Sequence, residues 1–133
     1  MARIVLDTDV VSRARAGRLA PQVSRQLIGH ELCVAFATAG ELWKGALAAR
    51  WGGIRQGGLQ LWLDQATILR ADLKVAFVWG EITVRAQRRG RPRSENDTWI
   101  AACCIEIGLP LLTLNLRHFA DFAEHDGLKL LAA

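Results

Sequence analysis

Apolar positions along the chain fall into short runs and longer amphipathic stretches that alternate over most of its length. Five runs have the length of buried strands, and they lie at residues 3–6, 32–36, 67–69, 111–113 and 128–131. Helical spacing and end signals predict helices at 21–28, 38–50, 59–65, 72–89, 94–107 and 118–124, and a further helix that begins near Asp7. The alternation predicts an α/β fold with three layers, in which helices flank a central, mostly parallel sheet.

Length and composition fit one ordinary globular domain. The chain has 133 residues, close to the commonest domain size, so residues 1–133 are expected to form a single domain. Its apolar runs fall well short of the roughly 20 residues that a membrane span needs, so no membrane contact is expected. Asp7 and Asp9 come too early for a secretory leader, which favours a cytoplasmic protein.

The cysteines and histidines show no metal-binding pattern. Cys33, Cys103 and Cys104 are odd in number and lack CxxC spacing, so we expect free, buried thiols rather than disulfides or a zinc site. The three histidines lack ligand spacing too, and they are interpreted as surface or packing residues. Of the five tryptophans, Trp43 and Trp99 are predicted to pack in the core or at an interface.

Acidic residues stand where predicted strands end or helices begin. Asp7 directly follows the first strand, and in open α/β sheets ligands bind at the carboxyl ends of strands. Capping of the next helix is the alternative role for Asp7 or Asp9. Glu41 follows Thr38 by three residues, and Asp97 follows Ser94 in the same way, so both fit capping boxes as well.

The surroundings of Asp97 favour a chemical role. It opens the stripe that continues through Ile100, Ala101 and Cys104, the face that a helix buries. A buried carboxylate needs a partner, and no Lys or Arg lies within a turn on that face. Three carboxylates from separate elements, Asp7, Glu41 and Asp97, would suit Mg²⁺ or Mn²⁺, because these ions prefer oxygen ligands.

Basic residues gather just before Asp97. The chain carries 17 basic and 13 acidic residues, a formal net charge of +4. Five arginines fall within residues 85–93, and they are Arg85, Arg88, Arg89, Arg91 and Arg93. Arginine forms bidentate contacts with phosphate, so the cluster is a candidate RNA-binding surface beside the candidate metal site. A solvated helix end with favourably placed cations is the alternative.

Four segments in this order resemble the VapC-type toxins of the PIN-domain family. They are Ile4-Val5-Leu6-Asp7-Thr8-Asp9-Val10-Val11-Ser12, Ala39-Gly40-Glu41-Leu42-Trp43-Lys44-Gly45-Ala46, Asn96-Asp97-Thr98-Trp99-Ile100-Ala101-Ala102 and Leu112-Thr113-Leu114-Asn115-Leu116-Arg117-His118-Phe119. The resemblance implies a PIN-like fold and Mg²⁺- or Mn²⁺-dependent cleavage of RNA, with Asp7, Glu41 and Asp97 as the acidic triad. It also implies a homodimer and a VapB-type antitoxin as partner.

Some positions depart from the family pattern. Asn115 stands where the family often has a fourth acid, and we keep it as a candidate catalytic residue. His118 follows three residues later, where some relatives carry an acid, and Asp9 replaces a commoner asparagine.

Two other functions remain open at this point. Asp7-x-Asp9 after a strand also matches the nucleophile loop of haloacid-dehalogenase-like phosphatases, although the later acidic pair of that fold is missing. A non-catalytic PIN-type domain that binds RNA or a partner is the second alternative. Metal-dependent cleavage of RNA by the pure protein separates all three functions.

Overall fold

The computed structural model describes residues 2–133, and each predicted strand and helix is present in it. The strands are β1 (Ala2–Leu6), β2 (His30–Ala35), β3 (Thr67–Leu69), β4 (Leu111–Thr113) and β5 (Leu130–Ala132). The helices are α1 (Thr8–Arg15), α2 (Pro21–Leu27), α3 (Phe36–Ala48), α4 (Gly53–Gln65), α5 (Leu73–Arg88), α6 (Glu95–Ile107) and α7 (Leu116–His125).

The strands form one sheet in the order β3-β2-β1-β4-β5, and each pairing within it is parallel. The chain first builds outward from β1 to β3, then returns to the other side of β1 with β4. The strand order therefore reverses between β1 and β4. In a parallel α/β sheet such a switch point leaves a crevice at the carboxyl ends of the strands.

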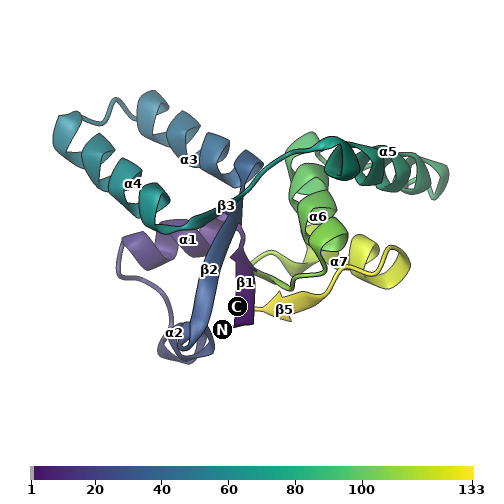
Figure 1. Cartoon of the computed structure of the whole chain (residues 1–133), viewed down its shortest axis with the longest axis horizontal. Helices are drawn as coiled ribbons and strands as arrows, with labels where there is room; N and C mark the ends of the chain where they lie inside the picture. Colours follow the sequence, from purple (N-terminus) through teal and green to yellow (C-terminus); the bar gives the residue numbers. More distant parts are fainter. Residues whose placement is uncertain (1) are drawn as a thin grey trace.

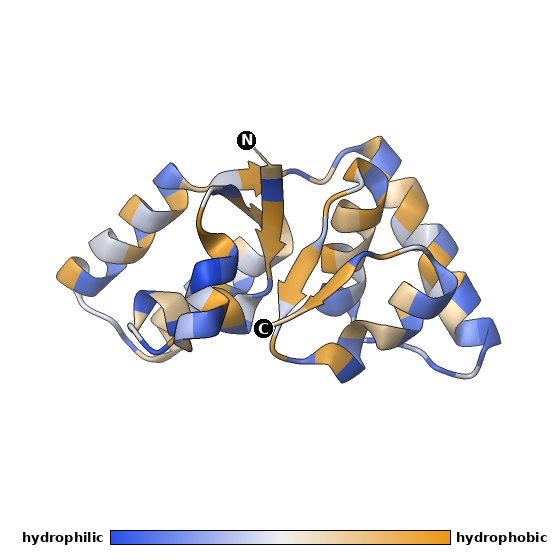
Figure 2. Cartoon of the chain, turned by 90° about the horizontal axis from the view of Figure 1, so that it is seen from below, coloured by the Kyte–Doolittle hydropathy of each residue, from blue (hydrophilic) through white to orange (hydrophobic). Residues whose placement is uncertain are grey.

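Helices cover both faces of the sheet, as predicted (Figure 1). Alternate residues of β1 point to opposite faces. Val5 belongs to the core under α5, α6 and α7, whereas Ile4 and Leu6 belong to the core under α1 to α4. Both faces of the strands are apolar, and Figure 2 shows the hydrophobic strands between two sets of helices. The α/β three-layer prediction is confirmed.

Smaller predictions about packing are also confirmed. Cys33, Cys103 and Cys104 are free and buried. Trp99 stacks on Trp79 with 4.9 Å between ring centroids, so its role is packing. None of the helices within residues 2–133 has the length and apolar character needed to cross a bilayer.

Three helices begin earlier than the sequence predicts. α3 begins at Phe36 rather than at Thr38, α4 begins at Gly53 rather than at residue 59, and α7 begins at Leu116 rather than at residue 118. Glycines at 57 and 58 predict a loop, because glycine disfavours helix by about 1 kcal/mol relative to alanine. At Gly58 a Cβ would lie 3.4 Å from Arg15 Nη2, an ordinary van der Waals contact, so the helix tolerates the position without requiring glycine.

Candidate active site at the strand switch point

Asp7 lies in the crevice where the strand order reverses. It is 6% exposed and occupies the N-cap of α1, where its Oδ1 accepts a 2.8 Å hydrogen bond from the Thr8 amide. Its Oδ2 accepts a 2.8 Å bond from Thr113 Oγ1 at the end of β4. The capping role considered for Asp7 is thus real, but a cap uses only one carboxylate oxygen. The second oxygen joins β1 to β4 across the switch point.

Glu41 points toward Asp7 from a neighbouring helix. Because α3 begins at Phe36 with Ala35 as its N-cap, Thr38 is a fully buried helix residue, and the capping-box interpretation of Glu41 is wrong. The side chain instead accepts a 2.9 Å hydrogen bond at Oε1 from Thr8 Oγ1. A helix that starts at the end of β2 therefore delivers this carboxylate to the end of β1.

Asp97 reaches the site from the first turn of α6. Ser94 caps this helix, its Oγ accepting a 3.2 Å hydrogen bond from the Asp97 amide, so half of the predicted capping box is present. The Asp97 carboxylate contacts a residue of α7 instead, with its Oδ2 3.3 Å from His118 Nδ1. The sequence predicts His118 as a surface or packing residue, and its side chain is 56% exposed. Its position three residues after Asn115 was the available signal for a role here.

Asn115 follows β4 and connects to α1. Its Nδ2 donates a short hydrogen bond to Asp9 Oδ2, and its amide donates a 2.9 Å bond to Thr113 Oγ1. Asp9 therefore has a direct partner in the residue that replaces the expected fourth acid.

Two acids of the site, Asp7 and Glu41, have raised pKa values. Burial raises the pKa of Asp7, accepted hydrogen bonds lower it in part, and the charges of Asp97 and Asp9 raise it further. Burial likewise raises the pKa of Glu41, with Asp7, Asp97 and Asp9 adding to the effect. Within residues 2–133 no Lys or Arg forms an ion pair with any of these four acids. A cation would relieve this repulsion.

The donor set fits Mg²⁺ or Mn²⁺ in chemistry and charge. Among the described residues no group of three or more His, Cys, Asp or Glu side chains is arranged so that it could hold a metal ion. Such a group is not required, because Mg²⁺ keeps several waters and takes only one or two carboxylates directly. The buried Asp7 carboxylate, in electrostatic contact with Asp97 and Glu41, meets that requirement.

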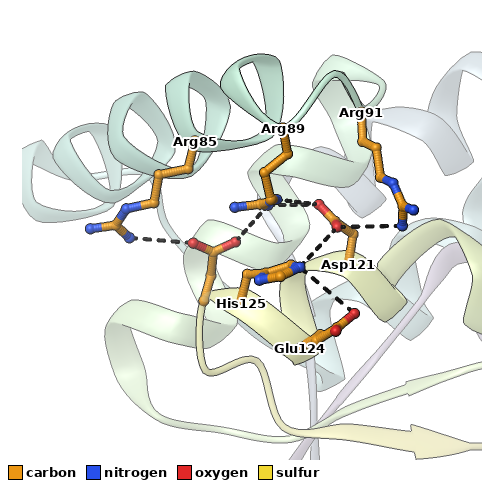
Figure 3. A network of polar contacts seen from close by, with 7 residues as sticks. Arg85, Arg89, Arg91, Asp121, Glu124 and His125 are labelled. Atoms are coloured by element: carbon orange, nitrogen blue, oxygen red, sulfur yellow. Dashed lines mark hydrogen bonds and ion pairs between the residues drawn. The ribbon is translucent and has the colours of Figure 1, made fainter.

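The arginine cluster divides into paired and unpaired members. Arg89 Nη2 lies 2.6 Å from Asp121 Oδ2 and 3.2 Å from Asp126 Oδ2, and Arg85 Nη1 lies 3.3 Å from Asp126 Oδ1. Arg91 Nη1 approaches Asp121 Oδ1 at 4.0 Å (Figure 3). Both aspartates are buried, so these contacts tie the end of α5 to α7. Part of the predicted RNA-binding charge is therefore compensated within the protein.

Arg88 and Arg93 differ from these residues. Neither forms an ion pair with an acid of residues 2–133, and Arg88 is exposed. RNA contact by the cluster remains a prediction. Arg88 and Arg93 are the members whose guanidinium N–H donors are not used in an ion pair within residues 2–133.

Comparisons of the sequence and of the structure with known proteins point to the same family. The PIN domain family matches residues 4–125. Ribonuclease VapC5 of Mycobacterium tuberculosis is 33% identical over 126 residues, which cover 92% of this chain and 87% of that protein. The crystal structure of VapBC-5, a member of the VapBC family of toxin-antitoxin systems from the same organism, has a TM-score of 0.77 at 29% identity over 100% of both chains. DNA-bound VapBC from Salmonella typhimurium has a TM-score of 0.86 at 22% identity, over 99% of this chain and 98% of that one.

Proposed function

Because the chain belongs to the PIN domain family, as a relative of the VapC ribonucleases, we propose that it is an endoribonuclease that hydrolyses RNA with the help of a divalent metal ion. The observation that carries the proposal is that Asp7, Glu41 and Asp97 lie near enough to interact electrostatically, while no arginine or lysine of residues 2–133 forms an ion pair with them. The phosphatase alternative is set aside, since the whole fold follows the PIN family.

Each carboxylate has a supporting side chain. Asp7 and Asp97 would hold the ion most directly, with Glu41 completing the charge around it. Bound there, Mg²⁺ or Mn²⁺ supplies polarisation of the phosphodiester and activation of an attacking water. Thr113 orients Asp7, Thr8 orients Glu41, and His118 orients Asp97. These contacts fix the carboxylates before substrate arrives, which is the usual role of groups around a metal site.

The proposed biological role is that of a toxin controlled by a VapB-type antitoxin. Support comes from the similar solved structures, which are toxin-antitoxin complexes. Expression of the chain alone should arrest growth of a bacterial host, and co-expression of the antitoxin should relieve the arrest. Glu41→Gln keeps the size of the side chain and the acceptor for Thr8 but removes the charge, so the bacterial host should grow when it expresses this variant. Growth arrest by Glu41→Gln at equal protein level would contradict the proposed site.

Purified variants test the catalytic part. Asp7→Asn and Asp97→Asn should each lower Mg²⁺-dependent RNA cleavage by more than about 100-fold, since even supporting residues of metal sites contribute about 10–100-fold. Asp72→Asn is the matched control, because Asp72 caps α5 outside the acidic site and asparagine caps equally well. Activity near that of wild type in either site variant, with EDTA abolishing cleavage in parallel, would remove these acids from the mechanism. Metal-independent RNA binding without cleavage would instead favour the non-catalytic domain.

A further inference from the structure

A cavity of about 490 Å³ leads away from the acidic site. Two helices contribute lining residues at successive turns. They are Thr8, Ser12 and Arg15 on α1, Glu41 and Gly45 on α3, and Ala49 at the C-cap of α3. Spacing of three or four residues keeps each set on one face of its helix. The cavity is therefore a groove that runs along both helices, and we call it the α1–α3 groove.

One end of the groove is the proposed catalytic site. Thr8 and Glu41 line it there and are hydrogen bonded to each other at 2.9 Å. Arg15 lies seven residues further along α1, which corresponds to about 10 Å of helix. A ligand that follows the groove would thus contact the acidic site and Arg15 together.

The other end carries two guanidinium groups on one indole ring. Arg55 Cζ lies 4.1 Å and Arg15 Cζ 5.8 Å from the centroid of Trp51, within the range of cation–π contacts. Neither arginine forms an ion pair with a carboxylate of residues 2–133. Contact with the ring positions the two charges but leaves most of their N–H donors for another acceptor.

Small residues leave that end of the groove open. Gly45 and Ala49 lie on the α3 side, and Gly58 of α4 lies opposite Arg15. Glycine at position 58 has a cost inside a helix, yet any side chain there would fill the space beside the Arg15 guanidinium. From these three positions nothing larger than a methyl group projects into that end of the groove.

We propose that Arg15 and Arg55 form a phosphate-binding subsite that holds a phosphate of single-stranded RNA beside the one that is cleaved. The proposal rests on the proposed ribonuclease function and names a part of its substrate site. A guanidinium binds phosphate with two parallel hydrogen bonds, and two such groups held on one ring match one phosphate. RNA fits better than an acidic protein segment, because one strand can place phosphates at both ends of the groove.

Binding of a fluorescent 12-nucleotide single-stranded RNA in EDTA, at several salt concentrations, tests the subsite without cleavage. Arg15→Ala/Arg55→Ala should raise Kd about tenfold and flatten the plot of log K against log salt by about 0.7, the value for one lost phosphate contact. Arg13→Ala/Arg18→Ala removes the same charge from exposed positions outside the groove and should change both quantities much less. Arg15→Lys/Arg55→Lys keeps the charge, so it should keep the slope while Kd rises about threefold, even if the alanine variant does not fold.

Other outcomes have distinct meanings. Equal Kd and slope in the groove variant and its matched control would overturn the subsite. Loss of affinity for the antitoxin with unchanged RNA binding would assign the groove to the protein partner instead. In Mg²⁺, the groove variant should raise KM for RNA cleavage about tenfold and keep kcat within about twofold. A wild-type protein that cleaves normally beside a groove variant with normal KM refutes the subsite alone, whereas a wild type without cleavage refutes the ribonuclease proposal and the subsite together.

Discussion

Asp7 and Glu41 lie in surroundings that disfavour their charged forms. Burial and neighbouring carboxylates raise the pKa of both groups. Metal ions bind the deprotonated form, so binding weakens as pH falls through these pKa values. We predict that Mn²⁺ affinity begins to fall at a pH clearly above the ordinary carboxyl range of about 4. Calorimetric titration with Mn²⁺ between pH 7.5 and 4.5 measures this dependence. A Mn²⁺ affinity that stays unchanged down to pH 4.5 would contradict the prediction.

The same raised pKa makes Glu41 a cost to the metal-free fold. A carboxyl whose pKa is higher in the folded state destabilises that state at neutral pH, and the cost disappears as pH falls through the folded pKa. Glu41→Gln removes the charge and keeps the acceptor for Thr8. In EDTA at pH 7 the variant should therefore melt about 1–3 °C higher than wild type. A lower Tm would show that the Glu41 charge stabilises the fold.

Single positions of the site could be predicted, but their partners could not. The sequence points to Asp7, Glu41 and Asp97 because each follows a predicted strand or lies in the first turn of a predicted helix, which is local information. Thr113 hydrogen bonds to Asp7 across 106 residues, and no local pattern indicates that contact. For Glu41 the local pattern was misleading, since Thr38 resembles a cap only when the true start of α3 is unknown.

At the scale of elements, α5 and α7 are joined by the buried carboxylate of Asp121. Burial alone would raise its pKa, but hydrogen bonds and charge from Arg89 outweigh burial and lower it. A lowered pKa contributes stability that is complete above about pH 4 and is lost as pH falls through the folded value. Asp121→Asn should therefore cost about 2 kcal/mol at pH 7, somewhat below a fully buried pair because Arg89 is 22% exposed.

Urea unfolding at two pH values checks this prediction. The difference between wild type and Asp121→Asn should shrink at pH 3, because protons bind the Asp121 carboxyl of the unfolded wild type there and favour unfolding. Asp64→Asn serves as a control, because the exposed Asp64 carboxylate accepts a 2.8 Å hydrogen bond from Gln60 Nε2 on the surface of α4. An equal difference at both pH values would mean that the Arg89 contact does not depend on charge.

Helix α4 offers a matched pair of substitutions. Gly57 and Gly58 both lie inside the helix, and alanine at either position should stabilise the protein by about 0.5–1 kcal/mol. A Cβ at Gly57 meets open space, whereas one at Gly58 lies against Arg15 in the α1–α3 groove. Thermal unfolding should show a gain for both variants, and RNA binding should weaken only for Gly58→Ala. Equal RNA binding by the two variants would argue against a narrow groove.

The same helix shows where prediction of elements fails. Strands and most helices can be predicted from apolar spacing, because buried positions recur along the sequence with the period of the element that contains them. The first turns of α4 carry glycines that predict a loop, and the position of Gly58 beside Arg15 of α1 exists only in the folded protein. The arginine cluster is similar, since its charge could be read from the sequence but its acidic partners on α7 could not.

At the scale of the whole molecule, α5 presents an uncovered apolar stripe. Leu73, Phe77 and Val84 are 88%, 68% and 41% exposed and lie at helical spacing. We expect this stripe to pair with a second copy of the chain, in line with the expected homodimer. Phe77→Glu should convert the dimer to a monomer in analytical ultracentrifugation without loss of fold. Ile54→Glu, at a 94% exposed position of α4, is the control and should leave the dimer intact. A monomeric wild type would contradict the expectation.

The pairing of β1 with β4 also determines how late in translation the centre of the sheet can form. The two ends of the Asp7–Thr113 contact are 106 residues apart, and ribosomes add about 5–20 residues each second. The first strand therefore waits roughly 5–20 s for its neighbour to be synthesised. During that time the nascent chain lacks Thr113, and for most of it Asp97 as well. Under the proposed function, a ribosome that makes this nuclease is exposed to its activity only after translation of the chain is nearly complete.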